Sequence, residues 1–117
     1  MEPQVGGLLV RRGGARAFVS AEQARQIVAE PRISRVPGSP LGMALVAGRI
    51  VGVLELGSST GALLVCELDG QLVACAGLVL ERAGFFSKTP EGVWDSGELV
   101  PDLALERLVK GAPRGEA

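Results

Sequence analysis

An Asp-Gly pair at residues 69–70, set between two apolar runs, constrains the fold of this chain more than any other segment. Asp-Gly is a preferred pair for a two-residue type I′ turn, because both residues tolerate a positive φ. The pair therefore predicts an antiparallel β-hairpin. In its register Leu68 faces Gln71 and Cys66 faces Val73, and we expect the second arm to run on as one strand to residue 80.

The same register places the second cysteine, Cys75, diagonal to Cys66 on one face of the hairpin. Diagonal neighbours lie about 7–8 Å apart, which is too far for an easy disulfide. With no other soft ligand nearby, the pair cannot complete a four-ligand zinc site. Free cysteine is among the most buried residue types, so we expect two free, buried thiols.

Three further segments have the pattern of hairpins, and together they indicate a mainly β protein. The hairpins are expected over residues 8–19, 41–56 and 93–100, with turns at Gly13-Gly14, Ala47-Gly48 and Asp95-Ser96-Gly97. Residues 105–109 are expected to form a last helical turn. The chain has 117 residues, which predicts a single domain. We expect an ordered core over about residues 7–110 and a loose tail at residues 111–117.

One segment changes period and predicts a short amphipathic helix over residues 21–30. Ser20 is a suitable N-cap, and Gln23 three residues later completes a capping box. Ala24, Ile27 and Val28 then fall on one face of a helix, and a proline follows at position 31.

Composition excludes several classes of function. The chain has no His, a formal net charge of -1 and 3% aromatic residues. A His-based catalytic triad, a His-rich metal site and a basic nucleic-acid-binding surface are therefore not expected. The amino terminus lacks the pattern of a signal peptide, and no apolar run approaches the ~20 residues that span a bilayer. We expect a cytoplasmic protein.

Residues 57–61, Gly-Ser-Ser-Thr-Gly, match the G-x-S-x-G pattern of a nucleophile elbow. That pattern needs a helix after it and a base beside it. Here it lies between two expected strands, and the chain has no His. A small hydrolase using Ser59 or Cys66 is a remote alternative, and a linker is the better interpretation.

Four segments share the order and spacing of a known family. A Val-Pro-Gly-Ser-Pro connection at residues 36–40 follows residues 21–28, and residues 42–56 form an apolar hairpin with Ala-Gly at its turn. Residues 65–82 form a second hairpin, and residues 92–108 close the domain. Together these segments resemble a CheW-like domain, the adaptor module of bacterial chemosensory arrays.

The resemblance implies a fold of two adjoining five-stranded β-barrels with one or two short helices. It implies no catalytic activity, cofactor or metal. The partners that it implies are the cytoplasmic tip of a chemoreceptor and the regulatory domain of a CheA-type histidine kinase, together with another CheW-like protein as a further candidate. The chain would then couple the receptor to the kinase.

The resemblance also implies where partners bind. The residues that match the family's partner surfaces lie in the connection and in the first hairpin turn: Ile33, Val36, Gly38, Val46, Ala47, Gly48 and Arg49. In the family's turn an Arg precedes the Gly, whereas here Ala47 takes its place and removes the charge-assisted donors that a guanidinium supplies. Ile33 and Val36 also suit the core.

Compared with the family, the chain is also shortened between Pro40 and Gly42, after Leu56 and before Gly92. The changed turn and these short loops resemble the short CheW-like proteins found beside full-length members in the Frz system of gliding bacteria. A second hypothesis follows, in which the chain is a modulator that has lost one partner surface, of receptor or kinase, and tunes array assembly.

Overall fold

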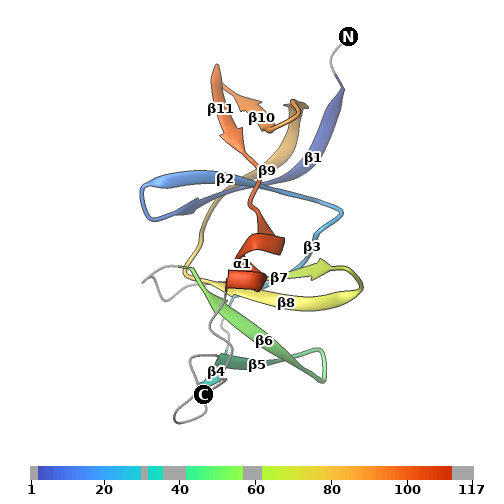
Figure 1. Ribbon diagram of the computed structural model, residues 1–117, viewed down its shortest axis with the longest axis vertical. Helices are drawn as coiled ribbons and strands as arrows, with labels where there is room; N and C mark the ends of the chain where they lie inside the picture. Colours follow the sequence, from blue (N-terminus) through green and yellow to red (C-terminus); the bar gives the residue numbers. More distant parts are fainter. Residues whose placement is uncertain (1–2, 30–31, 36–41, 57–61, 112–117) are drawn as a thin grey trace.

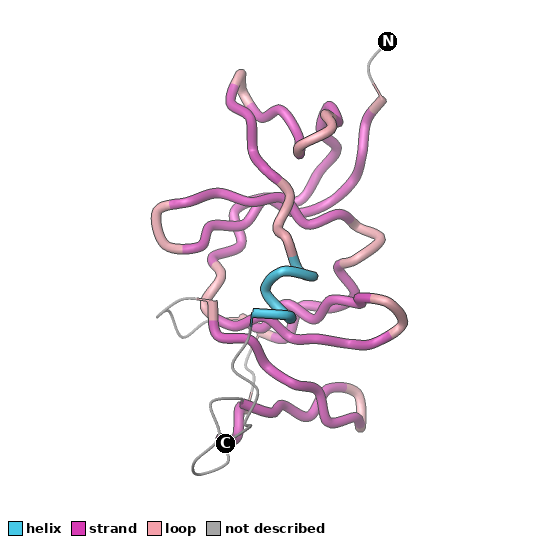
Figure 2. Tube along the Cα trace, viewed as in Figure 1, coloured by secondary structure: helices cyan, strands magenta, loops and turns pink. Residues whose placement is uncertain are grey.

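The computed structural model describes residues 3–29, 32–35, 42–56 and 62–111. Val36, Gly38, the Gly-Ser-Ser-Thr-Gly motif and residues 112–117 of the predicted tail lie outside them. The described chain is almost entirely β-structure with one short helix (Figure 2). Its strands are β1 (Gln4–Arg12), β2 (Ala15–Ser20), β3 (Ala24–Val28), β4 (Ile33–Arg35), β5 (Gly42–Val46), β6 (Arg49–Glu55), β7 (Leu63–Leu68), β8 (Gln71–Ala76), β9 (Val79–Lys88), β10 (Gly92–Asp95) and β11 (Glu98–Pro101), and the helix is α1 (Leu105–Gly111).

The first sheet combines the two ends of the chain in the order β11-β10-β9-β1-β2. The sheet is strongly curled, so that its edge strands β11 and β2 come together, and residues after β11 contact β2. Asp102 forms a parallel bridge with Phe18, and the amide of Leu103 donates a hydrogen bond of 2.8 Å to the Phe18 carbonyl. The sheet is thus close to a barrel, and it occupies the upper part of Figure 1.

The second sheet is built from the middle of the chain in the order β3-β7-β8-β6-β5-β4. Its pairs are antiparallel except for β6 and β8, which run parallel. The β5–β6 hairpin and β4 form the end of the molecule farthest from β10 and β11 (Figure 1). The molecule is elongated as a result, with extents of 51 × 28 × 27 Å.

Three buried apolar clusters hold this arrangement together. Leu9, Phe18 and Phe86 are part of the cluster inside the first sheet, and Val51, Val53 and other residues fill the second. The third cluster joins the two sheets: Val10, Ala17, Val19, Leu54, Leu56, Leu64, Cys66, Cys75, Leu78, Leu103 and Leu105. A polar link adds to it, since Nε of Arg12 donates a 2.9 Å hydrogen bond to the Leu56 carbonyl.

The structure confirms the predicted hairpins. Leu68 pairs with Gln71 and Cys66 with Val73, as the Asp-Gly pair requires. The β5–β6 turn also has both residues in the left-handed region, with Ala47 at a φ of 49° and Gly48 at 79°, whereas in the first turn only Gly13 is there. The last hairpin turns on Ser96-Gly97, and the predicted helical turn is the start of α1.

The predicted helix over residues 21–30 is wrong, because a tight turn and a strand take its place. The amide of Gln23 donates to the Ser20 carbonyl at 3.0 Å, which closes one turn, and β3 then pairs with β7. A bulge between Ala24 and Gln26 puts Ala24 and Ile27 against the same groove. That spacing of three imitates the period of a helix.

The long strand predicted up to residue 80 is also corrected. It ends at Ala76, because Gly77 has a φ of 87°, and the chain leaves the second sheet to begin β9 in the first. The fold class is confirmed: the chain is mainly β, with two curled sheets and a short helix. The sheets have five and six strands rather than five each.

Candidate protein-interaction surfaces

The two cysteine thiols, the most reactive groups among the described residues, lie inside the fold. Cys66 and Cys75 are free and fully buried, as predicted. The neighbouring Cys66 thiol and burial both raise the pKa of Cys75, so that thiol is protonated at neutral pH. Neither thiol can reach a substrate, which removes support for Cys66 as a nucleophile. Among the described residues no cluster of His, Cys, Asp or Glu could hold a metal ion.

A cluster of ion pairs closes one end of the first sheet. Arg16 on β2 contacts Glu81 at 3.0 Å, Asp95 at 2.5 Å and Glu98 at 3.1 Å, and Arg82 also pairs with Asp95. Hydrogen bonds from Arg16 hold the pKa of Glu81 and of Asp95 below their usual values. Both carboxylates are therefore ionised and share Arg16 as a partner, which makes them structural groups.

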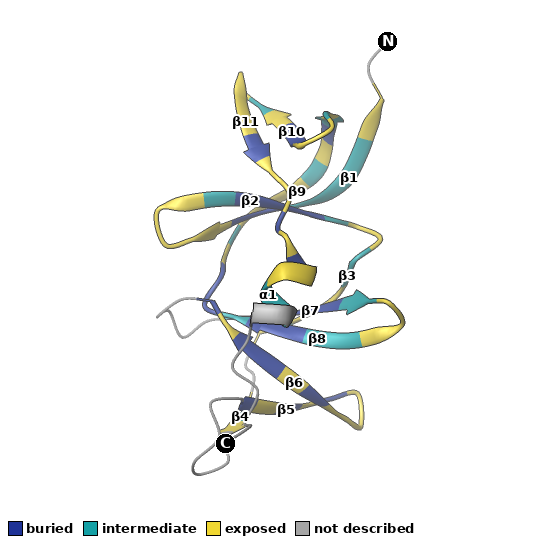
Figure 3. Cartoon of the chain, in the orientation of Figure 1, coloured by how far each residue is buried: buried dark blue, intermediate teal, exposed yellow. Residues whose placement is uncertain are grey.

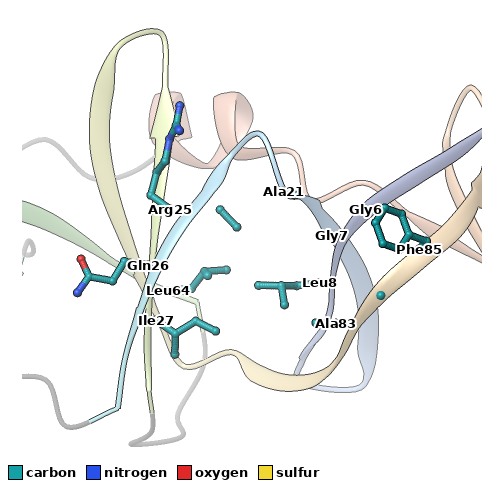
Figure 4. Close-up of a pocket in the computed structure, with 12 residues that line it drawn as sticks. Gly6, Gly7, Leu8, Ala21, Arg25, Gln26, Ile27, Leu64, Ala83 and Phe85 are labelled. Atoms are coloured by element: carbon teal, nitrogen blue, oxygen red, sulfur yellow. The ribbon is translucent and has the colours of Figure 1, made fainter.

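A groove of about 450 Å³ lies between the two sheets (Figure 4). One wall comes from β1 and β9 and the other from β3. It is lined by Gly6, Gly7, Leu8, Ala21, Ala24, Arg25, Gln26, Ile27, Leu64, Ala83, Gly84 and Phe85. The single charged side chain of this lining is Arg25, which pairs with Glu67. The groove therefore offers an apolar surface with almost no unpaired charge.

Phe85 is the most exposed apolar side chain among the described residues, at 77%. It sits against Gly6 of the neighbouring strand, where an added Cβ would come within 3.2 Å of its ring. The glycine thus allows the aromatic ring to lie close to the sheet. Across the groove Ile27 is 46% exposed. Exposed large apolar groups that face one groove are typical of a binding site.

The apolar surface continues from the groove onto the outer face of β9, β10 and β11. Trp94 is paired with Ser87 on β9 and with Leu99 on β11. Because alternate residues of a strand share a face, Phe85 lies on this face too. We name Phe85, Trp94 and Leu99 the aromatic face. Trp94 is 46% exposed and suits an anchor for a partner.

A second exposed apolar surface lies at the opposite end of the molecule, on the β5–β6 hairpin (Figure 3). Leu45 and Ile50 are cross-strand partners, with exposures of 70% and 74%. Met43 lies on the same face, two residues before Leu45. We name Met43, Leu45 and Ile50 the hairpin face. The opposite side of this hairpin, including Ala44 and Val51, is buried in the core.

The structure separates the predicted site residues. Ala47, Gly48 and Arg49 are exposed at the tip of the β5–β6 hairpin. Val46 is buried in the core of the second sheet, and Ile33 packs against that core from β4. The tip is therefore accessible, whereas the two apolar residues stabilise the sheet that carries it.

Sequence reasoning missed the hairpin face, the groove and Ile27. Leu45 and Ile50 differ from their buried neighbours only by strand parity. The alternation along this hairpin separates its residues into two apolar faces, and the sequence alone does not decide which face is exposed to solvent. The groove had no local signal, because it forms where β1 and β9 meet β3, which are distant in the sequence.

The architecture is that of a mainly β domain with two curled sheets that share a core. Among solved structures, it is similar to the crystal structure of the scaffolding protein TtCheW from Thermoanaerobacter tengcongensis. The TM-score is 0.58 at 14% identity, over 77% of this chain and 64% of that one. This chain thus covers less than two thirds of that protein and has a CheW-like fold.

The sequence comparisons add no family. No protein-family profile matches the sequence, and no curated protein matches it. Within the residues that the structure describes, no helix is both long and apolar enough to cross a membrane.

Proposed function

We propose that the chain is a non-enzymatic adaptor in a bacterial chemosensory system, and that it couples a chemoreceptor tip to a CheA-type histidine kinase. The observation that carries the proposal is the apolar groove with Phe85 at its rim, on a CheW-like fold. A groove lined by small and aliphatic side chains suits an apolar segment of a partner protein. The proposed location is the cytoplasm, at a chemoreceptor array.

An adaptor needs separate surfaces for its partners, and this fold has two. The groove lies between the two sheets and the aromatic face lies on the first sheet, whereas the exposed tip at Ala47, Gly48 and Arg49 ends the β5–β6 hairpin of the second sheet (Figure 1). The scaffolding protein of similar fold supports the same kind of role. Val36 and Gly38 belong to the proposed surface by resemblance to the family, whereas Ile33 and Val46 support it from the core.

A direct test measures the binding of the purified chain to two probes, by calorimetry in separate titrations. The probes are a chemoreceptor cytoplasmic tip and the regulatory domain of a CheA-type kinase. We expect at least one to bind. Phe85→Asp should weaken that binding about 30-fold or more, which is the effect of losing a hot spot. Val79→Asp is the matched control, because Val79 is also exposed on β9 but lies outside the groove.

Either of two results would overturn the proposal. One is that neither probe binds the wild-type chain. The other is that Phe85→Asp and Val79→Asp weaken binding equally, since the groove would then have no special part.

The second hypothesis, a modulator with one partner surface lost, is favoured by Ala47 at the exposed tip. It would make the chain similar to FrzB-like members of gliding bacteria. Ala47→Arg tests it, because Arg restores the donors that the family has at this position. A receptor affinity that rises in Ala47→Arg supports the loss of that surface, and an unchanged affinity contradicts it.

A further inference from the structure

The hairpin face lies on a surface whose other half is already covered within the molecule. The outer side of the second sheet includes Leu64, Cys66, Cys75 and Leu54, and these residues pack under the first sheet and α1. Further along the same face, on β5 and at the start of β6, nothing among the described residues covers Leu45 and Ile50.

No charged residue lies on this bare surface among the described residues of β4, β5 and β6. On β5 and β6, the residues that share its face are Met43, Leu45, Ile50 and Gly52. Ser34, the partner of Met43 on β4, is uncharged as well. The charged residues of these two strands are Arg49 and Glu55, at the two ends of β6. Their positions alternate with those of Ile50 and Gly52, so they belong to the other face of the strand.

A face without charge is suited to meeting a copy of itself. In a two-fold symmetric contact the same patch occurs on both sides, so a charged residue near the axis faces its own kind and is repelled. A neutral aliphatic patch avoids that cost. Two sheets can pack face to face at a spacing of about 10 Å when both faces are apolar.

The described residues leave access to the face open as well. The β5–β6 hairpin is at one end of the long axis (Figure 3), so a second copy can approach without meeting the first sheet. Gly52 carries no side chain, and an added Cβ there would have no atom within 4 Å. The centre of the face is therefore shallow and able to accept a side chain of the partner copy.

We propose that the hairpin face is a homodimer interface, in which Leu45 and Ile50 of two copies pack across a two-fold axis. This inference does not rest on the proposed adaptor function, because it concerns the chain alone. The hairpin tip at Ala47 and Gly48 borders the interface, so dimerisation would compete with any partner that binds the tip.

Sedimentation velocity of the full chain over a series of concentrations tests the proposal. We expect a reversible monomer–dimer equilibrium for the wild type. Leu45→Asp should weaken dimerisation about 30-fold or more, since it places like charges across the axis. Phe85→Asp is the matched control, because it puts the same charge on an equally exposed site of the other surface. It should leave the equilibrium unchanged.

Charge swapping makes the test specific. Leu45→Asp and Leu45→Lys should each be monomeric, and an equimolar mixture of the two should recover the dimer. Circular dichroism of each variant checks that the fold is intact. A wild-type chain that stays monomeric at every concentration overturns the proposal. So does a dimer that Phe85→Asp breaks and Leu45→Asp does not, which would assign self-association to the aromatic face.

Discussion

One half of the outer face of the second sheet is covered within the molecule, and the other half is exposed to solvent. At β7 and β8, Leu64, Cys66 and Cys75 are wholly buried beneath the first sheet. At β5 and β6, the equally apolar Leu45 and Ile50 are open to solvent. The covered half contributes to the free energy of folding, because folding of the chain removes its apolar area from water. The bare half contributes little to folding and is available for a partner.

The largest predicted contrast comes from truncating one leucine in each half. Leu64→Ala should lower the free energy of unfolding by about 2–5 kcal/mol, because it removes buried methyl groups and leaves a cavity. At concentrations at which the chain is monomeric, Leu45→Ala should change it by less than about 0.5 kcal/mol, as exposed substitutions do. Chemical denaturation of both variants measures the difference. Equal losses would mean that the hairpin face is covered in the folded chain.

Two glycines, one packed in the first sheet and one on the bare half of the second, should respond to an added methyl group with opposite signs. At Gly7 an added Cβ would lie 2.3 Å from the Val19 carbonyl oxygen and 2.5 Å from the Phe18 ring, so Gly7→Ala should cost about 1–3 kcal/mol. At Gly52 a Cβ meets nothing within 4 Å, and Gly52→Ala should stabilise by about 0.4–1 kcal/mol. Thermal unfolding of both variants checks the signs. A destabilised Gly52→Ala would contradict an open hairpin face.

A smaller effect is expected at the tip of the bare hairpin. Ala47 has a φ of 49°, a left-handed conformation that is unfavourable for a residue with a Cβ. Ala47→Gly should therefore raise the free energy of unfolding, by about 0.5–1 kcal/mol after the entropy cost of glycine. Urea denaturation measures this change. A loss of stability would show that the side chain of Ala47 has a packing role.

The smallest effect concerns the ion cluster at the other end of the molecule. Arg16 lowers the pKa of Glu81 and Asp95 in the folded state. The stability that they supply is therefore present above their unfolded pKa values and is lost as the pH falls through the folded ones. In Arg16→Met, the melting temperature should fall less steeply below about pH 4.5 than in the wild type. An unchanged slope would mean that solvent screens these pairs completely.

The comparison also explains what the sequence could predict. Two-residue turns are local, so Asp69-Gly70 gave the correct hairpin and register and Ala47-Gly48 gave the correct hairpin. The strand β3 was predicted as a helix, because a bulge after Ala24 gave Ile27 a helical spacing. Its true partner, β7, lies about forty residues away in the sequence, and that distant pairing overrides the local preference.

The candidate surfaces were harder to predict than the strands. Resemblance located the tip residues Ala47, Gly48 and Arg49, which are exposed. Alternation shows that Leu45 and Val46 point to opposite sides, but both are apolar, and only the packing of the two sheets decides which is covered. The groove beside Phe85 likewise exists only once β1 and β9 meet β3.

The most direct test of the account is whether the chain joins two partners at once. Light scattering coupled to gel filtration would measure the mass of the complex formed from the chain, a chemoreceptor cytoplasmic tip and a CheA-type regulatory domain. The account predicts a species that contains all three proteins, and its loss in Phe85→Asp but not in Val79→Asp. A tip and a regulatory domain that elute without the wild-type chain would contradict it.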